Sequence, residues 1–150
     1  MEEILYRNAD INDLDLIREM FYHFMNIQQF EPIADDEYDY TFAHLIQDKR
    51  DTCIVAEKEG NILGFLNLTY TFSTFNAAYE ANVDDIYVAD EYRGQGIATQ
   101  LLKAAIEDAN LKGACRISIL VRIEDTEARA LFEKLHFVKF DRLYYRKSLK

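Results

Sequence analysis

A glycine-containing segment past the middle of the chain has the residue types needed to bind a phosphate group. It follows a strand-like run that ends at Val88, and it reads Arg93-Gly94-Gln95-Gly96-Ile97-Ala98-Thr99. The first turn of a helix has four N–H groups without partners inside the helix, and it carries a partial positive charge. Glycines remove the side chains that would keep a phosphate away from those groups, and Arg93 adds a cation. The segment therefore predicts a site for a pyrophosphate.

Two other phosphate-binding motifs do not fit this segment. The dinucleotide fingerprint needs a glycine where this chain has Thr99, and it needs an early βαβ unit that the chain does not show. The P-loop needs Gly-Lys followed by Ser or Thr, which does not occur in the sequence. On local grounds alone, a loop whose glycines only permit a tight strand-to-helix turn stays an open alternative.

The elements around this loop are predicted from the spacing of apolar residues. A long amphipathic helix follows the loop and ends at Lys112-Gly113. Four strand-like runs precede the loop, and the last three of them, which are separated by turn residues, together predict an antiparallel meander. The predicted strands before the loop cover residues 4–7, 53–56, 62–73 and 82–88, and the predicted helices there cover 14–25 and 36–47.

The last part of the chain predicts one more strand, one helix and a hairpin. Cys115 to Val121 is mostly apolar, as expected of a strand that is covered on both faces. A short helix follows, with Ala128, Leu131, Phe132 and Leu135 directed inward, and residues 137–140 and 143–146 form a terminal hairpin. The order of elements predicts a three-layer α/β domain with helices packed on a mixed sheet.

Length and composition restrict the class of protein. The 150 residues include 17 Lys and Arg against 27 Asp and Glu, so the net charge is −10. This length predicts a single domain over residues 1–150, and the acidic balance argues against a nucleic-acid partner. Because no signal peptide or spanning segment is found, we expect a soluble cytoplasmic protein. Cys53 and Cys115 are predicted to be buried free thiols, and no residue spacing indicates a metal site.

Two segments resemble the GNAT superfamily of acyl-CoA-dependent N-acetyltransferases. Residues 93–98 are similar to the family signature R/Q-x-x-G-x-G/A, in the same position between a strand and a helix. Residues 125–137 resemble the family segment N-x-x-A-x-x-L-Y-x-x-x-G-F. The resemblance extends through the order of elements, and it implies a three-layer α/β/α fold. Its sheet is mixed and mostly antiparallel, with a splay between the central strands.

The resemblance implies that acetyl-CoA binds in the splay between the strand that ends at Val88 and the strand that ends near Val121. Backbone groups of Ile86 and Val88 pair with the pantetheine arm, and N–H groups of residues 93–99 hold the pyrophosphate. A neutral amine then attacks, and the CoA thiolate leaves. The predicted cofactor-binding residues are Ile86, Tyr87, Val88, Arg93, Gly94, Gln95, Gly96, Ile97, Ala98, Thr99 and Asp125.

This chemistry requires a base and a donor for the oxyanion. An alkylammonium with a pKa of about 10 must lose a proton before it attacks. Asp84 matches an acidic position of GNAT enzymes that acetylate diamines, and Glu80 in the preceding loop is the alternative base. Strand alternation places Asp84 and Asp85 on opposite faces. The backbone N–H of Val88 is the predicted oxyanion donor. For Asp84 and for Glu80, a solvated carboxylate without a catalytic role stays open.

Three positions depart from the family pattern. The family tyrosine that protonates the thiolate is Phe132 here, which has no proton to give. Tyr144, Tyr145 or water could take that role, or the thiolate could leave unaided because a thiol pKa is only about 8.5. The family asparagine is Asp125, and the family glycine is His136, which we interpret as an ordinary turn residue.

The acceptor side is predicted from carboxylates and aromatic rings in the first two helices and in the loop after residue 72. Carboxylates with aromatic faces suit a small cationic amine, although a solvated acidic face over core aromatics explains most of these residues better. The residues are Glu31, Asp35, Asp36, Glu37, Asp39, Phe30, Tyr38, Tyr40, Phe72, Phe75 and Tyr79.

The leading hypothesis is an N-acetyltransferase that transfers an acetyl group from acetyl-CoA to a primary amine by direct attack in a ternary complex. The alternative is an acyl-CoA-binding regulatory module without turnover, which the phenylalanine at position 132 suggests. A dinucleotide-binding domain is a third hypothesis. We expect a small-molecule partner and no nucleic-acid or membrane partner. Because members of the family are often dimers, a homodimer stays open.

Overall fold

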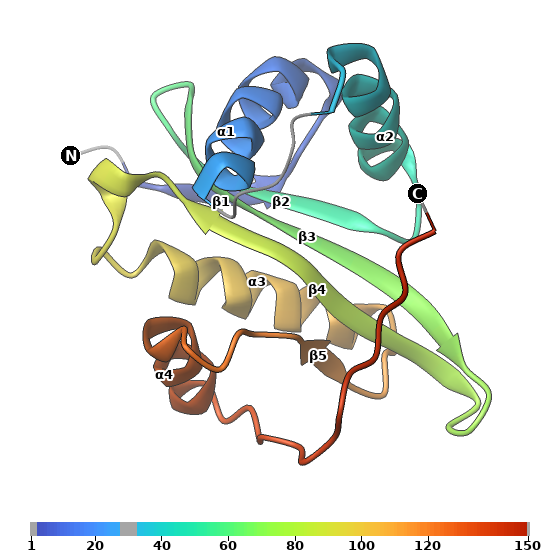
Figure 1. The fold of residues 1–150 in the computed structure, drawn as a ribbon. Coiled ribbons are helices and arrows are strands. Elements are labelled where there is room, and N and C mark those ends of the chain that lie inside the picture. Colours follow the sequence, from blue (N-terminus) through green and yellow to red (C-terminus); the bar gives the residue numbers. More distant parts are fainter. Residues whose placement is uncertain (1–2, 28–32, 150) are drawn as a thin grey trace. The chain divides into compact units, whose positions relative to one another are not determined.

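The apolar runs of the first 120 residues form a mixed sheet in the computed structural model, which describes residues 3–27 and 33–149. Within these residues the strand order is β1-β2-β3-β4-β5 (Figure 1). β1 to β4 are antiparallel to their neighbours, as the predicted meander requires, and β5 runs parallel to β4. The strands are β1 Leu5–Asn8, β2 Thr52–Lys58, β3 Asn61–Ser73, β4 Ala78–Val88 and β5 Ile117–Ile119.

Helices cover both faces of this sheet. α1 (Leu14–Ile27) and α2 (Asp35–Gln47) lie on one face, and α3 (Ile97–Leu111) lies on the other (Figure 1). On the first face, Ile17 and Phe42 pack with Phe65 in a buried cluster. The buried residues of α3, among them Leu101 and Leu102, form the apolar stripe of a helix that packs on β2, β3 and β4. The predicted three-layer α/β/α architecture is therefore confirmed.

Residues 121–150 form a second compact unit, separate from residues 1–120, and we describe it by itself. α4 (Thr126–Lys134) begins at Asp125, whose Oδ1 accepts a hydrogen bond of 3.0 Å from the N–H of Ala128. The rings of Phe132 and Phe137 pack at 5.7 Å between centroids. The predicted single domain over residues 1–150 stays a prediction. Phe30 and Glu31, assigned above to the acceptor side, lie outside the described residues.

The predicted terminal hairpin is wrong. Residues 137–149 have no regular secondary structure, and in this segment the loop bond from the N–H of Arg142 to the carbonyl of Phe140 replaces a strand ladder. Aromatic and β-branched residues favour strands, but a strand also requires a partner for its backbone groups. Leu143 and Tyr145 are exposed instead of being packed on one face.

The predicted strand from Cys115 to Val121 is also too long, and it is not covered on both faces. The strand itself covers only Ile117–Ile119, although the N–H of Cys115 and the carbonyl of Arg116 also form hydrogen bonds with β4, and Cys115 and Leu120 are exposed. β5 is the last strand in the sheet order, so the apolar run has a neighbour on one side only. Cys115 is therefore not the buried thiol that we expected. Cys53 is buried as predicted, and burial raises the pKa of its thiol to about 12.

Of the helices in the described residues, none has the length and apolar character to cross a membrane.

Arg7 of β1 attaches the start of α1 to the sheet. Its guanidinium binds both carboxylate oxygens of Asp13 at 2.7 and 2.9 Å, and its Nε donates to Glu57 of β2 at 2.8 Å. Asp13 is buried, and it also accepts a bond of 2.8 Å from the N–H of Asp10. The hydrogen bond from Arg7 holds the pKa of Asp13 below its ordinary value. The ionised pair therefore stabilises the folded state.

We predict that Asp13→Asn lowers the free energy of unfolding at pH 7 by about 2 kcal/mol, because it removes one partner of a half-buried ion pair. Since the pKa of Asp13 is depressed, its contribution is complete above pH 3.8 and is lost as the pH falls further. The two proteins should therefore converge in acid. Urea unfolding at pH 7 and near pH 2 measures this, and Asp15→Asn is the control because Asp15 is an exposed partner of Arg18. Equal stability of Asp13→Asn and the native protein at pH 7 would contradict the prediction.

Candidate functional site

The last five residues of β4 have a free outer edge. The ladder between β4 and β5 ends at Val83 paired with Ile119, whereas β4 continues to Val88. On the other side, the N–H of Ala89 donates to the carbonyl of Leu63 at 2.9 Å. Backbone groups alternate in direction along a strand, so the N–H groups of Ile86 and Val88 point away from β3. This edge can pair with an extended ligand, and it begins where the ladder between β4 and β5 ends.

A glycine in β3 permits the close approach that places Val88. Gly64 lies opposite Val88, and a Cβ on it would stand 2.7 Å from the carbonyl oxygen of Tyr87 and 3.2 Å from Cγ2 of Val88. A backbone atom at 2.7 Å cannot move aside as a side-chain end can. Gly64 was not singled out in the sequence, although a glycine inside a strand pattern is a known signal of close backbone approach.

The loop after β4 adopts the conformation that its glycines allow. Gly94 and Gly96 have φ of +74° and +81°, and Gly96 is the N-cap residue of α3. A Cβ at either glycine would meet no atom within 4 Å, so there is space for a side chain at both positions. Glycine is favoured there because the backbone is in the left-handed region. Ile97 is fully buried and anchors the helix start.

The first turn of α3 presents free N–H groups. Gln100 is the first residue of α3 whose N–H bonds back, to Gly96 at 3.1 Å. Within the described part of the chain, the N–H groups of Ile97, Ala98 and Thr99 have no hydrogen-bond partner, and this turn has no acidic residue. These groups and the helix dipole together attract an anion.

Arg93 connects the loop to β4. Its Nε donates to the carbonyl of Val88 at 3.1 Å, and its guanidinium pairs with Asp90 at 3.0 Å and lies 5.5 Å from the ring centre of Tyr87. The outward carbonyl of Val88 therefore has a partner, whereas its N–H is left to a ligand. Tyr87 itself pairs with Phe65 of β3 and has a buried ring, so it would affect a bound cofactor only through Arg93. Gln95 is an exposed residue of the loop.

A β-bulge corrects the predicted placement of the two aspartates. Asn67 of β3 pairs with Asp85, and the next residue, Leu68, pairs with Val83, so Asp84 is an extra residue in β4. An extra residue changes the alternation of side chains along the strand. Asp84 and Asp85 therefore line the same cavity, and the prediction of opposite faces is wrong.

That cavity has a volume of about 290 Å³ and lies between the α1–α2 layer and strands β3 and β4. Aromatic rings of Phe21, Tyr38 and Phe42 line it together with Asp84 and Asp85. Burial raises the pKa of both carboxyl groups, although a hydrogen bond from Thr69 to Asp84 and one from Asn67 to Asp85 act in the opposite direction. Asp84 stays in contact with solvent. It is thus a more basic carboxylate than usual, with a route for a proton to leave.

Glu80 is less suited to act as a base. It lies in β4 and not in the preceding loop as predicted, and it forms an ion pair with Arg116. The hydrogen bond from Arg116, supported by one from Asn76, lowers the pKa of Glu80. At the usual rise along a strand, Glu80 also stands about 13 Å from Asp84. The geometry therefore favours Asp84 over the alternative.

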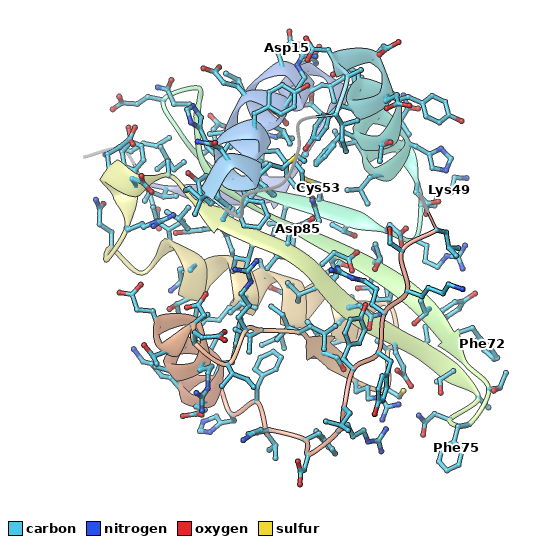
Figure 2. All side chains as sticks on the ribbon, viewed as in Figure 1. Asp15, Lys49, Cys53, Phe72, Phe75 and Asp85 are labelled. Carbon is cyan, nitrogen blue, oxygen red and sulfur yellow. The ribbon has the colours of Figure 1, made fainter. Side chains whose placement is uncertain are left out.

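The predicted aromatic residues of the acceptor side do not gather in one place. Tyr38 lines the cavity, whereas Tyr40 is an exposed residue of α2. Phe72 and Phe75 lie at the distant end of the β3–β4 hairpin, and Asp85 lies farther along β4 (Figure 2). Asn67 and Asp85 line the cavity, although the sequence did not assign them a functional role. The only signal for them was the neighbouring pair of aspartates.

The four positions that the sequence analysis singles out in residues 121–150 are described within that unit. Asp125 is the N-cap of α4, as reported above, and Phe132 is buried with its ring on Phe137. Tyr144 is exposed in the segment without regular structure. His136 has φ of +65° and its N–H donates to Glu133, which confirms it as a turn residue at the end of α4.

A larger hollow of about 680 Å³ lies elsewhere, beside the end of α2 and the end of α3. Its lining includes the basic residues His44, Lys49, Arg50 and Lys112. The ammonium group of Lys112 already has partners within the protein, because its Nζ donates to the carbonyl of Arg50 at 2.7 Å and pairs with Asp108 at 3.0 Å. The lining has neither the paired aspartates nor the free edge of β4, so we assign the chemistry to the smaller cavity.

Comparison with known proteins agrees with this geometry. The sequence model of a protein family described as "Acetyltransferase (GNAT) family" matches residues 17–137. The chain belongs to the GNAT acetyltransferase family. It is therefore an N-acetyltransferase that uses acetyl-CoA. An N-alpha-acetyltransferase of Saccharolobus solfataricus is 29% identical over an alignment 140 residues long, and the alignment covers 89% of this chain and 79% of that protein.

Solved structures share the GNAT fold. AAC(6')-Iy, in complex with the bisubstrate analogue CoA-S-monomethyl-acetylneamine, has a TM-score of 0.83 at 20% identity and covers 98% of this chain and 99% of its own. A Clostridium acetobutylicum acetyltransferase solved with acetyl-CoA has a TM-score of 0.81 at 19% identity, over 97% of this chain and 96% of its own.

We predict that Gly64→Ala weakens CoA binding about tenfold, since moving Val88 by a few tenths of an ångström disturbs the edge on which an extended ligand would pair. Calorimetric titration of CoA measures this. Gly113→Ala is a control for a destabilising glycine substitution away from β4, because Gly113 has a positive φ of +71° and follows the far end of α3. Gly113→Ala should lose stability and keep its affinity for CoA. Unchanged affinity in Gly64→Ala would show that the position of Val88 does not matter for the cofactor.

Proposed function

We propose that this GNAT protein transfers the acetyl group of acetyl-CoA to a primary amine of a small cationic molecule, by direct attack in a ternary complex. The observation that carries the proposal is the bulge in β4. It directs two aspartates into one aromatic-lined cavity, and the same strand has a free edge at Ile86 and Val88.

The arrangement of β4 and α3 supports the cofactor part of the proposal. The free N–H groups of Ile97, Ala98 and Thr99 would hold the pyrophosphate, and the outer edge at Ile86 and Val88 would pair with the pantetheine arm. The first turn of α3 has no carboxylate that would repel the phosphates. Arg93, whose Nε donates to the carbonyl of Val88, would add a positive charge at the mouth of the loop.

The chemistry assigns one role to each of two groups. Asp84 accepts a proton from the ammonium, through water because its side chain is short, and the neutral nitrogen attacks the thioester carbonyl. The N–H of Val88 donates to the oxyanion as the C–N bond forms. The nitrogen then loses its second proton to water, the C–S bond breaks as the carbonyl re-forms, and the sulfur leaves as a thiolate that takes up a proton. With phenylalanine at position 132, Tyr144 or water supplies that proton, or the thiolate leaves unaided.

The acceptor class follows from charge and from the relatives. Three acidic residues, Asp35, Asp36 and Glu37, form the first turn of α2, and Glu37 also lines the cavity. The relatives named above include an N-alpha-acetyltransferase and an enzyme crystallised with an acetylneamine conjugate, so the family accepts amines of different sizes. We favour a small amine because the cavity is small.

The two free cysteines favour a reducing compartment such as the cytoplasm. A homodimer stays a prediction.

Phe132 defines the alternative hypothesis that the activity test must exclude, an acyl-CoA-binding module without turnover. Such a module would bind CoA through the same loop and edge, but it would release no thiol when acetyl-CoA and amines are supplied. Thiol release over a panel of polyamines, aminoglycosides, amino acids and peptides separates the two functions. CoA binding without turnover on any amine would favour the module.

We predict that Asp84→Asn lowers kcat/KM by about 10²- to 10³-fold while CoA affinity stays the same, because a general base contributes in that range. Native activity should fall in acid as Asp84 takes up a proton at its raised pKa, and Asp84→Asn should lack this decline.

The same variant should be at least as stable as the native protein at pH 7. A raised pKa means that the folded protein binds the proton more tightly than the unfolded chain, so the ionised carboxylate lowers stability as the pH rises. Glu80→Gln is the control and should keep its turnover. Full turnover in Asp84→Asn together with loss in Glu80→Gln would reverse the assignment of the base.

A further inference from the structure

Two buried polar atoms in the cavity lack a hydrogen-bond partner. Among the described residues, the hydroxyl of Tyr38 and Oδ1 of Asn67 are buried without any partner, and each residue is only 3% exposed. Both residues line the cavity of about 290 Å³ that contains Asp84 and Asp85. Burying a polar atom without a hydrogen-bond partner is unfavourable, so such atoms in a cavity indicate a ligand that forms the missing hydrogen bonds.

The available atoms at this end of the cavity are mostly acceptors. Nδ2 of Asn67 donates to Oδ2 of Asp85 at 3.0 Å, which leaves the amide oxygen of Asn67 as a free acceptor. The carboxylates of Asp84 and Asp85 can only accept when they are ionised, and the Tyr38 oxygen can accept as well. A matching ligand therefore carries a positive charge and several N–H donors. An anion would face the carboxylates of Glu37, Asp84 and Asp85 without a compensating cation from the cavity lining.

The rest of the cavity suits an aliphatic stem. Tyr38 stacks on Phe42 at 4.6 Å between ring centres, and Phe21 lies 5.1 Å from Tyr38. These rings offer apolar surface for methylene groups and attract a cation through their faces. A volume of about 290 Å³ is at the lower limit of small-molecule sites. A short aliphatic amine fits this volume.

We propose that the cavity between α2 and the bulge of β4 binds the primary ammonium group of a small aliphatic amine, and that Tyr38 and Asn67 determine this specificity. The proposal rests on the proposed function, because the bound amine is taken to be the acetyl acceptor. A quaternary ammonium would contact the rings, but it has no N–H donor for the Tyr38 oxygen or for Oδ1 of Asn67. Primary amines are therefore selected over quaternary ones of similar size.

The test is a calorimetric titration of the native protein and Tyr38→Phe with n-butylammonium and with tetramethylammonium, without acetyl-CoA. We expect n-butylammonium to bind the native protein more tightly than tetramethylammonium does, and Tyr38→Phe to weaken n-butylammonium binding at least fivefold. Tyr38→Phe without ligand should unfold at the same temperature as the native protein or higher, because it loses an unpartnered hydroxyl. Tyr40→Phe is the matched control on the exposed side of the same helix, and it should change neither quantity.

Three results would overturn the proposal: no binding of n-butylammonium to the native protein, equal affinity for tetramethylammonium, or loss of stability in Tyr38→Phe with unchanged affinity. The last result would mean that the hydroxyl has a structural role only. The outcome is separable from that of the proposed function. If n-butylammonium binds as expected but no amine is acetylated, the binding site stands and the acetyl transfer does not.

Discussion

The ladder between β4 and β5 ends at Val83, and the bulge at Asp84 begins where that ladder ends. The free edge and the cavity both depend on this point in the sheet. Beyond it, the outer edge of β4 is open to a ligand, and the extra residue directs a second carboxylate toward the α1–α2 layer. Without the bulge, Asp84 and Asp85 would lie on opposite faces of the strand, and β4 would contribute only one carboxylate to the cavity.

Contacts with β3 and contacts at the end of β4 hold this strand in place. On one side, Gly64 permits β3 to approach Val88, and the N–H of Ala89 closes the ladder at Leu63. At the end of β4, Arg93 binds the carbonyl of Val88, and buried Ile97 anchors the start of α3. The outward N–H of Val88 and the free first turn of α3 therefore belong to one continuous segment, and contacts fix both of its ends. Such preorganised donors are the kind of arrangement that stabilises an oxyanion and a phosphate.

The sequence predicted the elements and the loop better than it predicted the cavity. Apolar periodicity located α3 almost to the residue, and the signature around Gly94 and Gly96 identified the family, because both depend on local spacing. Asp84 was placed on the wrong face because a bulge depends on pairing with a distant strand. For the same reason the terminal hairpin was wrong, since strand propensity does not supply a partner. Asn67 gave no signal, because its importance arises from burial next to Asp85.

Amide hydrogen exchange with and without CoA tests the central assignment most directly. In the protein alone, the N–H groups of Ile86 and Val88 and those of residues 97–99 lack partners in the described structure, so they should exchange rapidly. Bound CoA should slow exchange at both sets of amides together, because the arm and the pyrophosphate engage them at once. Protection confined to the basic hollow around Arg50, with no change along β4 and the start of α3, would contradict the account.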